Sequence, residues 1–394
     1  MMSGKELGGM PVPNCPMHDA FNREFEREQQ YNTNALNQSV HSKMPFLNQQ
    51  QKTAYDKIVR AVYDGNGGIF FINAPGRTDK TFLISLILDT IQVQSEIALA
   101  VASSGIAATL FEGGHTTHST LKLPLSSQTL EEPTCNITIT SAMAKVLQNC
   151  KIIIWNECTM AHKRALEAVD QKLGNLCSNQ IFFRGMMILL AGDFYQMQPV
   201  GPRSTSGDEI NACLNASILW RNVKNLKLTM NKQVALQNDI SAEVFSKALL
   251  DISNGRIPVD PSTGLISFPP NFFLFTTSKK ELISKVFLNI DASYKIHAWL
   301  TKRAILATKN KDGYDLNTKI QSKTNGQIHS FKSIDSIIDP NEVFNYSTEF
   351  LNALDLPGLP PHNLQLKIGS VIIMIRNLNQ PNCATEQDSL LKIL

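Results

Sequence analysis

Lys80 and Thr81 open an apolar, helix-like segment directly after a turn that contains proline and glycine. In such a turn the backbone N–H groups can hold phosphate oxygens, the lysine neutralises their charge and the threonine hydroxyl reaches Mg²⁺. The octapeptide Ala74-Pro-Gly-Arg-Thr-Asp-Lys-Thr81, here called the phosphate loop, departs from the consensus G-x-x-x-x-G-K-[ST] at both glycines. Taken alone, it would equally fit an ordinary strand, turn and helix.

Acidic and amide side chains follow two other apolar segments further along the chain. Asn156 and Glu157 directly follow one of them, and Asp193 and Gln196 follow the next. A carboxylate such as Glu157, placed after a strand and opposite the phosphate loop, is hard to explain without a function. Asp193 has a simpler alternative, because an aspartate can cap the turn that follows a strand.

Short apolar segments alternate with helix-like segments in the first half of the chain. Strands are expected over 68–72, 97–102, 152–155 and 187–191, and helices over 48–63 and 80–92, with another helix start at Ser104. Asn48 is a suitable cap for the first helix. Strands of four to six apolar residues separated by helices predict the α/β class, with a doubly wound parallel sheet.

The rest of the chain divides by composition. Residues 1–45 are polar and rich in Asn, Gln and Glu, so we expect a flexible or weakly helical lead-in, with ordered structure beginning at Phe46. We expect a first domain over 46–228 and a mainly helical connecting region over 229–300, with a Pro-rich break at 258–270. Residues 301–394 are expected to start a second α/β unit, with strands over 303–307 and 370–375.

Composition excludes some classes of protein. The 394 residues are 43% hydrophobic and 18% charged, which indicates a soluble globular protein. The net charge of +3 does not by itself indicate a nucleic-acid binder, but a groove could still be locally basic because net charge says nothing about distribution. The scattered, odd-numbered cysteines disfavour a disulfide framework and a zinc site, and fit a reducing compartment. We expect no membrane span and no secretory signal, and nothing distinguishes the cellular compartments.

With these segments in this order, the chain resembles the superfamily 1B DNA helicases of the Pif type, especially those carried by Helitron transposons. The resemblance runs from about Leu47 to Leu378. It is carried by Val101-Ala-Ser-Ser-Gly-Ile-Ala-Ala-Thr109, Gly113-Gly114, Thr117-His-Ser119, Gly192-Asp-Phe-Tyr-Gln-Met-Gln-Pro-Val200, Asn211-Ala-Cys-Leu-Asn-Ala-Ser217, Gly358-Leu-Pro-Pro-His362 and Arg376-Asn-Leu378. It implies a P-loop NTPase with a RecA-like first domain, a helical connection and a partial second RecA-like domain.

The resemblance also implies roles for residues around the nucleotide. It places Gln51 at the adenine, and Gly76, Lys80 and Thr81 at the phosphates and the metal. Glu157 would position or activate the attacking water, Asn156 stands at the magnesium position, and Gln196 would couple the γ-phosphate to the DNA track. Without the neighbouring motif, Gln51 would be interpreted as a surface glutamine.

A second set of residues falls where relatives hold the backbone of single-stranded DNA. These are Ser103, Ser104, Gly105, Thr117 and His118. Hydroxyl and N–H groups at helix starts can grip phosphates without reading base sequence, which suits this role. His118 has an alternative interpretation as a histidine that is simply satisfied at a helix end.

The sequence departs from the family pattern at the chemistry. Where relatives have glycine, this chain has Ala74, Arg77 and Asp79. A carboxylate about 4 Å from a phosphate charge, at an effective dielectric near 20, costs about 4 kcal/mol, or roughly a thousandfold in affinity. Asn156 replaces the aspartate that anchors magnesium, and Gln233 replaces an arginine expected to reach the γ-phosphate. The family's Asn-Gly-Thr-Arg loop and Ser-Gln-Gly motif do not follow Arg376-Asn-Leu378.

The resemblance implies an ATP-dependent, Mg²⁺-dependent helicase that unwinds DNA from 5′ to 3′ in repair, recombination, transposition or telomere maintenance. Its partner would be single-stranded or forked DNA, and we expect a monomer in the nucleus or mitochondrion. The substitutions favour an alternative for this copy, a decayed pseudo-helicase that binds single-stranded DNA without ATP turnover. A third possibility is an interaction module that uses the first domain as a scaffold.

Overall fold

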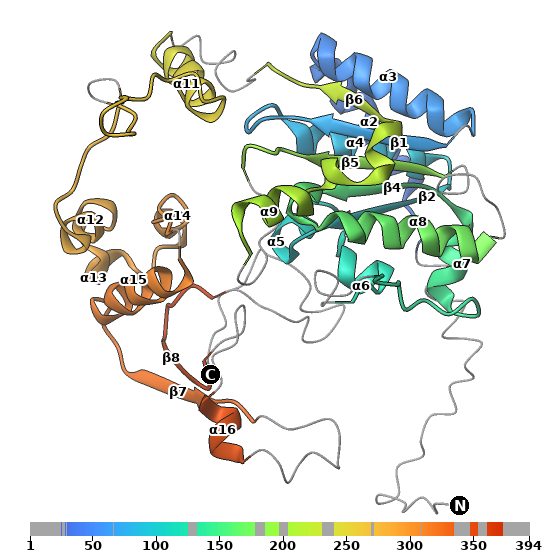
Figure 1. Ribbon diagram of the computed structural model, residues 1–394. Coiled ribbons are helices and arrows are strands. Elements are labelled where there is room, and N and C mark those ends of the chain that lie inside the picture. The colour runs from blue at the N-terminus through green and yellow to red at the C-terminus, as the bar shows by residue number, and fades with distance from the viewer. Residues whose placement is uncertain are drawn as a thin grey trace, which may run out of the picture. The chain divides into compact units, whose positions relative to one another are not determined.

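The structure is a computed structural model of the whole chain. It describes residues 25, 28, 30–65, 67–124, 132–177, 186–196, 204–230, 240–268, 272–307, 309–334, 347–353 and 361–372. The chain divides into two compact units, Met1–Ile266 and Ser267–Leu394 (Figure 1). The expected domain boundaries at residues 228 and 300 stay predictions.

A six-stranded parallel sheet forms the centre of the first unit. Its strand order is β3-β2-β4-β5-β1-β6. The strands are β1 (Gly68–Asn73), β2 (Ile97–Ala102), β3 (His115–Thr116), β4 (Cys150–Asn156), β5 (Met187–Gly192) and β6 (Val223–Lys227). The expected strands in this half of the chain are confirmed, and the non-consecutive order is that of a doubly wound α/β sheet.

The register of the sheet brings the ends of three strands level with one another. Asn73 at the end of β1 pairs with Gly192 at the end of β5. On the other side of β5, Asn156 at the end of β4 pairs with Ala191. Because the strands are parallel, the segments that leave β1, β4 and β5 all start from the same edge of the sheet. This edge is where ligands bind in open α/β folds.

Each face of the sheet has its own apolar core, because successive side chains of a buried strand point to opposite faces. One core contains Phe70 and Ile72 of β1 and is covered by α3 (Gln49–Tyr63) and α4 (Lys80–Val93). The other contains Phe71 of β1 and is covered by α7 (Ala142–Asn149) and α8 (Lys163–Cys177). The strands therefore read as continuous apolar runs, as expected for a sheet buried on both faces.

Two helices precede or begin the predicted first domain. Helix α3 is confirmed, with Asn48 and Gln51 forming a capping box at its start. The prediction that ordered structure begins at Phe46 is wrong, because α2 spans Thr33–Lys43. The polar sequence of α2 contains no apolar pattern that would predict a helix. Asp89 of α4 stabilises it by accepting hydrogen bonds from the Ser39 hydroxyl and the Lys43 ammonium group, each at 2.7 Å.

Shorter elements complete the first unit. They are η1 (Met44–Phe46), α5 (Gly105–Ala108), α6 (Thr117–Leu121), η2 (Cys158–Met160), α9 (Ser206–Ala212), η4 (Leu214–Ala216), η5 (Ile218–Asn222) and α11 (Ile240–Ser253). Helix α11 lies in the region expected to be a helical connection. Val259 and Ile266 form an isolated antiparallel bridge within the predicted Pro-rich break.

The described part of the second unit is helical with one antiparallel strand pair. Its elements are α12 (Lys279–Val286), α13 (Ile290–Ser293), α14 (His297–Leu300), α15 (Asn310–Ser322), β7 (Ile328–Lys332), α16 (Thr348–Ala353) and β8 (Asn363–Lys367). Strands β7 and β8 pair antiparallel. The strand expected over 303–307 is wrong, because these residues form no strand and Arg303 instead stacks on Trp299 and donates to its carbonyl oxygen. Of the strand expected over 370–375, residues 370–372 form no strand and residues 373–375 lie outside the described residues.

The cysteines of the described chain behave as buried apolar residues. Cys135, Cys150, Cys158 and Cys213 are free and buried. Burial raises the pKa of Cys135, Cys150 and Cys158 to about 12, so these side chains stay protonated thiols. Within the described ranges, no group of His, Cys, Asp and Glu side chains is arranged to hold a metal ion, and no helix is both long and apolar enough to cross a membrane.

Gly192 tests how tightly the end of β5 packs. A Cβ atom at this position would lie 2.7 Å from the Cγ2 atom of Thr159 and 3.3 Å from its backbone nitrogen. We expect Gly192→Ala to lower the free energy of unfolding by about 1–3 kcal/mol, measured by urea denaturation. Thr159→Ser removes the clashing methyl group and should recover part of this loss in the double variant.

The control for this prediction is Gly207→Ala in α9, where the added Cβ would make only an ordinary contact at 3.8 Å. Its helical position makes alanine neutral or stabilising. If Gly192→Ala were as stable as the parent, the end of β5 would have room for a methyl group, which would contradict the close packing against Thr159.

Candidate functional site

The phosphate loop joins β1 to α4 and has the backbone of a glycine-rich turn, although two of its left-handed positions carry other residues. Arg77 and Asp79 both have positive φ angles, of 67° and 55°. Asp79 occupies the N-cap position of α4 in the left-handed conformation. This conformation costs a non-glycine residue about 1–2 kcal/mol. The loop therefore keeps the backbone shape that presents N–H groups to a phosphate, and it is strained at the two positions where relatives have glycine.

Three hydrogen bonds hold the loop in this shape. The Ala74 N–H donates to the Gly192 carbonyl oxygen at 3.3 Å, which joins the loop to the end of β5. The Thr78 hydroxyl donates to the Pro75 carbonyl oxygen at 2.8 Å. The Gln51 amide donates to the Thr78 carbonyl oxygen at 3.0 Å. The loop is therefore supported from the sheet, from within and from α3.

Gln51 is fully buried, so its alternative interpretation as a surface glutamine is wrong. Its Nε2 atom binds the Thr78 carbonyl oxygen, and its Oε1 atom accepts from the Asn48 N–H at 3.1 Å. Both ends of the side chain therefore contact protein in this structure. The adenine contact stays a prediction, and the visible role of Gln51 is to connect the start of α3 to the phosphate loop.

Lys80 and Glu157 meet across the edge of the sheet. The Lys80 ammonium group lies 2.7 Å from a Glu157 carboxylate oxygen, and their side chains are 11% and 27% exposed. Lys80 follows the phosphate loop that leaves β1, and Glu157 directly follows the end of β4. The structure thus brings together the predicted phosphate-binding cation and the predicted water-activating carboxylate. An incoming phosphate would compete with Glu157 for Lys80.

Asn156 ends β4 beside this ion pair and is completely buried. Its Oδ1 and Nδ2 atoms have no hydrogen-bond partner among the described residues. A buried polar group in this state costs about 1–3 kcal/mol. An orphaned amide at a predicted ligand position fits a group that binds there, and its oxygen can accept from a metal-bound water. It brings no charge, so Thr81 and Asn156 would hold Mg²⁺ more weakly than a set that contains aspartate.

Asp193 and Gln196 form the turn after β5. The Asp193 carboxylate accepts from the Tyr195 N–H at 3.0 Å and from the Gln196 side-chain amide at 2.9 Å. This confirms the turn-capping interpretation of Asp193. The Gln196 Nε2 atom also lies 3.4 Å from where a Cβ atom on Gly76 would stand, so Gln196 borders the phosphate loop. A Cβ atom at position 76 would make an ordinary contact with the end of the Gln196 side chain.

The residues expected to hold DNA lie around the ends of β2 and β3. The Ser103 hydroxyl accepts from the Trp155 indole N–H at 2.9 Å, and the Ser104 hydroxyl accepts from the Ala107 N–H at 3.2 Å. The Thr117 hydroxyl instead donates to the Ala102 carbonyl oxygen at 3.0 Å. Gly105 is exposed at the start of α5. The structure therefore gathers the predicted DNA residues on neighbouring strand ends.

These hydroxyls differ in what they can still do. A hydroxyl has one proton to donate and two lone pairs to accept with. Ser103 and Ser104 both accept, so each retains its proton for a phosphate oxygen. Thr117 has already donated its proton and its side chain is buried, so a phosphate contact from it would require that bond to break. Its visible role is to fasten α6 to β2.

Sequence reasoning missed Trp155 and Gln50. Trp155 holds Ser103, although its position inside a buried strand marked it only as a core residue. The Gln50 side chain accepts from the Thr229 N–H and donates to the Thr229 hydroxyl, both at 2.9 Å, and so fastens the segment after β6 to α3. Nothing in the run Gln49-Gln-Gln51 indicates that Gln51 contacts the phosphate loop whereas Gln50 contacts Thr229. Gln233, beyond this segment, lies outside the described residues.

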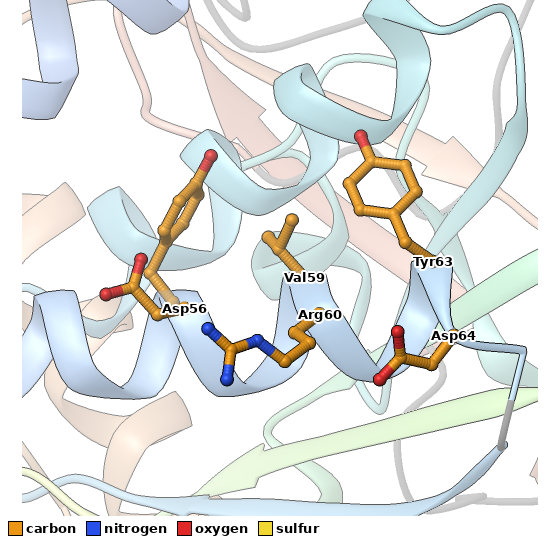
Figure 2. A pocket seen from close by; sticks show the side chains of 6 residues that line it. Asp56, Val59, Arg60, Tyr63 and Asp64 are labelled. Atoms are coloured by element: carbon orange, nitrogen blue, oxygen red, sulfur yellow. The ribbon is translucent and has the colours of Figure 1, made fainter.

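A shallow pocket of about 310 Å³ lies along α3. It is lined by Tyr55, Asp56, Val59, Arg60, Tyr63 and Asp64. Figure 2 shows Asp56, Arg60 and Asp64 following one another along the helix. No residue of the predicted nucleotide or DNA set lines it, so the pocket is separate from the site built on the strand ends.

Comparison with known proteins identifies similar families and folds. The family model described as PIF1-like helicase matches residues 46–263, which is more than half of the chain. The model for the DNA helicase Pif1 2B domain matches residues 349–383. The two matches fall in the first and second structural units, respectively, and part of the second lies outside the described residues.

Two curated relatives are similar along most of the chain. It is 20% identical to the ATP-dependent DNA helicase RRM3 of Saccharomyces cerevisiae over 92% of its length and 44% of that protein. It is 23% identical to the human ATP-dependent DNA helicase PIF1 over 86% of its length and 45% of that protein. The chain spans about half the length of these curated relatives.

Solved structures show the same fold at lower identity. The Pif1 helicase of Candida albicans superposes with a TM-score of 0.52 at 17% identity, covering 85% of this chain and 66% of that one. A Bacteroides Pif1 bound to single-stranded DNA gives a TM-score of 0.52 at 15% identity, covering 83% and 66%. These similarities confirm the predicted RecA-like P-loop fold class.

Burial of His118 predicts a pH dependence of stability. Burial lowers the pKa of this imidazole below its ordinary value of 6.5, so the folded chain disfavours the charged form. Above pH 6.5 both states are neutral, and His118 has no effect. As the pH falls through 6.5 the unfolded state binds the proton first, so the free energy of unfolding decreases.

We therefore expect His118→Gln to lose less stability than the parent between pH 7.5 and pH 5, measured by denaturant titration at each pH. His162, whose pKa is also lowered by burial and by Arg164 and Lys163, remains in both proteins and supplies a common background. Identical pH profiles for the two proteins would contradict the burial of His118.

Proposed function

We propose, since the chain belongs to the PIF1-like helicase family, that it is the motor core of an ATP-dependent DNA helicase with 5′-to-3′ polarity, impaired in this copy. The observation that carries the proposal is the Lys80–Glu157 pair beside the phosphate loop, at the edge shared by β1, β4 and β5. A cation for the phosphates and a carboxylate for water are the groups that phosphoryl transfer to water requires. The proposed work is unwinding DNA in repair or recombination.

The chain's own residues would divide the work on ATP as follows. The N–H groups of the phosphate loop and the Lys80 ammonium group would bind the β- and γ-phosphates. Glu157, released from Lys80 by the phosphate, would accept a hydrogen bond from the attacking water. Thr81 and Asn156 would hold Mg²⁺, which when bound neutralises charge that develops on the transferring phosphoryl group. Gln196, next to Gly76, would respond to the γ-phosphate.

The proposed impairment follows from the same site. The Asp79 carboxylate stands in the loop that must surround a multiply charged anion, where a single charge pair costs about 4 kcal/mol at an effective dielectric near 20. Asn156 provides no negative charge for the metal. Gln233, in place of an arginine, would further slow turnover. All three substitutions would weaken stabilisation of the transition state for hydrolysis.

The proposed partner is therefore single-stranded or forked DNA. Ser103 and Ser104 retain hydroxyl protons for phosphate oxygens, and the exposed Gly105 lets a backbone approach closely. Contacts of this kind carry no base specificity, which suits a protein that moves along a strand. A monomer in the nucleus or mitochondrion stays the expectation for assembly and compartment.

A second candidate function is a pseudo-helicase that binds single-stranded DNA without ATP turnover. The strained Asp79 and the orphaned Asn156 favour it, because both defects lie on the nucleotide side of the site. The two candidates share the DNA contacts and differ only in hydrolysis. Measurement of ATP turnover and of DNA binding in the same preparation separates them.

Asp79 gives the most specific prediction for nucleotide binding. We expect ATP turnover at least about a thousandfold below that of a family member with the glycine loop, because charge repulsion alone is worth that factor. Asp79→Gly with Asn156→Asp should restore nucleotide affinity first, measured by titration with a fluorescent ATP analogue. DNA-stimulated turnover near family rates in the parent chain would refute the impairment.

Asp79→Asn is the matched control for this experiment. It removes the charge but keeps a Cβ atom in the left-handed conformation, which asparagine tolerates better than most residues. Asp79→Gly should raise both nucleotide affinity and the thermal midpoint without nucleotide, whereas Asp79→Asn should raise mainly affinity. Equal affinity for all three proteins would show that the carboxylate does not face the phosphates.

The proposed DNA contacts predict salt-dependent binding of single strands. Fluorescence anisotropy with a labelled oligonucleotide, at two or more salt concentrations, should show affinity falling as salt rises, because each bound phosphate releases counterions. Ser104→Ala should weaken binding at each salt concentration, whereas Ser119→Ala, an exposed neighbour in α6, should leave the affinity unchanged. Binding that is absent or independent of salt would contradict both candidate functions.

A further inference from the structure

Ser103 is held at its hydroxyl and its backbone N–H by the end of β4. Its hydroxyl accepts from the Trp155 indole N–H at 2.9 Å, and its backbone N–H donates to the Asn156 carbonyl oxygen at 3.2 Å. The register of β2 against β4, which pairs Val101 with Trp155, sets this arrangement. Trp155 is 2% exposed and packs in the core beneath the sheet face that α8 covers, so its ring has little freedom to move.

The indole N–H determines whether the Ser103 hydroxyl donates or accepts in the hydrogen bond between them. An indole nitrogen can only donate, so the hydroxyl oxygen must accept from it. The serine proton then has to point elsewhere, and the serine side chain is half-buried rather than enclosed. The hydroxyl is thus presented as a donor to an acceptor outside the protein. Phosphate oxygens are acceptors only, and they match this group.

We propose that Trp155 is a positioning residue that holds the Ser103 hydroxyl ready to donate to a phosphate of single-stranded DNA. The inference rests on the proposed function, because it concerns the DNA contacts of the same site. Trp155 would not touch DNA itself. It would act by fixing the direction and rotamer of a hydroxyl that otherwise rotates freely.

The position of Trp155 also joins the two halves of the site. The strand ends one residue after Trp155, at Asn156, and the next residue, Glu157, pairs with Lys80. A displacement of the β4 end would therefore move the Ser103 hydroxyl with it, through two hydrogen bonds. Because Trp155 is one residue from the predicted metal position, nucleotide and DNA contacts are coupled at the end of a single strand.

The test is a double-mutant cycle on DNA binding. Ser103→Ala should weaken binding of a labelled single strand about three- to tenfold, as expected for one hydrogen bond. The Ser103 hydroxyl is uncharged and releases no counterions, so the loss should be of similar size at each salt concentration. Trp155→Phe should produce most of this loss. The double variant should match Ser103→Ala, because the indole acts only through the hydroxyl.

Two further proteins separate positioning from loss of fold. Trp220→Phe is the matched control, since Trp220 packs on Phe71 and Phe194 against the same core. Its affinity for the strand should equal that of the parent. Replacement of Trp155 by benzothienylalanine keeps the ring shape but has sulfur in place of the N–H, and it should reproduce the loss of affinity without the cavity that phenylalanine leaves.

The outcomes separate this inference from the proposed function. If the parent binds DNA and Ser103→Ala weakens binding, but both Trp155 replacements keep the parent's affinity, the positioning role is overturned and the proposed function stands. Additive effects of Trp155→Phe and Ser103→Ala would likewise overturn it. A parent chain without salt-dependent binding would contradict the proposed function and this inference together.

Discussion

The parallel pairing of β1, β4 and β5 is the constraint on which the site depends. Strands that run in one direction and end at one level must release their next residues at the same edge. Asn73, Asn156 and Gly192 are level by register. Three segments that are far apart in the sequence therefore lie together: the phosphate loop, the Glu157 carboxylate and the turn that contains Gln196. Apolar cores on both faces of the sheet keep that edge in place.

The phosphate loop combines a strained backbone with charged side chains. Arg77 and Asp79 retain left-handed backbone angles. This strain, about 1–2 kcal/mol for each residue, is sustained by the surrounding structure. Gln51 from α3 and Gly192 from β5 provide hydrogen bonds that the loop would otherwise satisfy with solvent. A loop held this firmly can keep the shape of a phosphate site while its charge opposes the ligand.

The proposed nucleotide side and DNA side of the site differ in how their polar groups are partnered. On the nucleotide side, Asn156 is an uncharged and unpartnered group where a metal ligand is expected. On the DNA side, Ser103 and Ser104 each retain a proton to donate, and the β4 end holds Ser103 through Trp155 and the Asn156 carbonyl. Loss of ATP chemistry with retention of strand binding is therefore a physically consistent state for this chain.

The sequence by itself determined the architecture of the first unit, because the apolar segments and the Asn48 cap are local signals that each segment carries alone. It also identified Lys80, Glu157 and Gln196 as residues of one site through their order along the chain. It failed for α2, whose polar residues bind Asp89, and for residues 303–307, where Arg303 binds Trp299 instead of entering a sheet. The partners of individual polar groups were decided only by the tertiary structure. Trp155 and Ser103, 52 residues apart, meet because β2 and β4 pair in one particular register, and no local pattern encodes a register between distant strands.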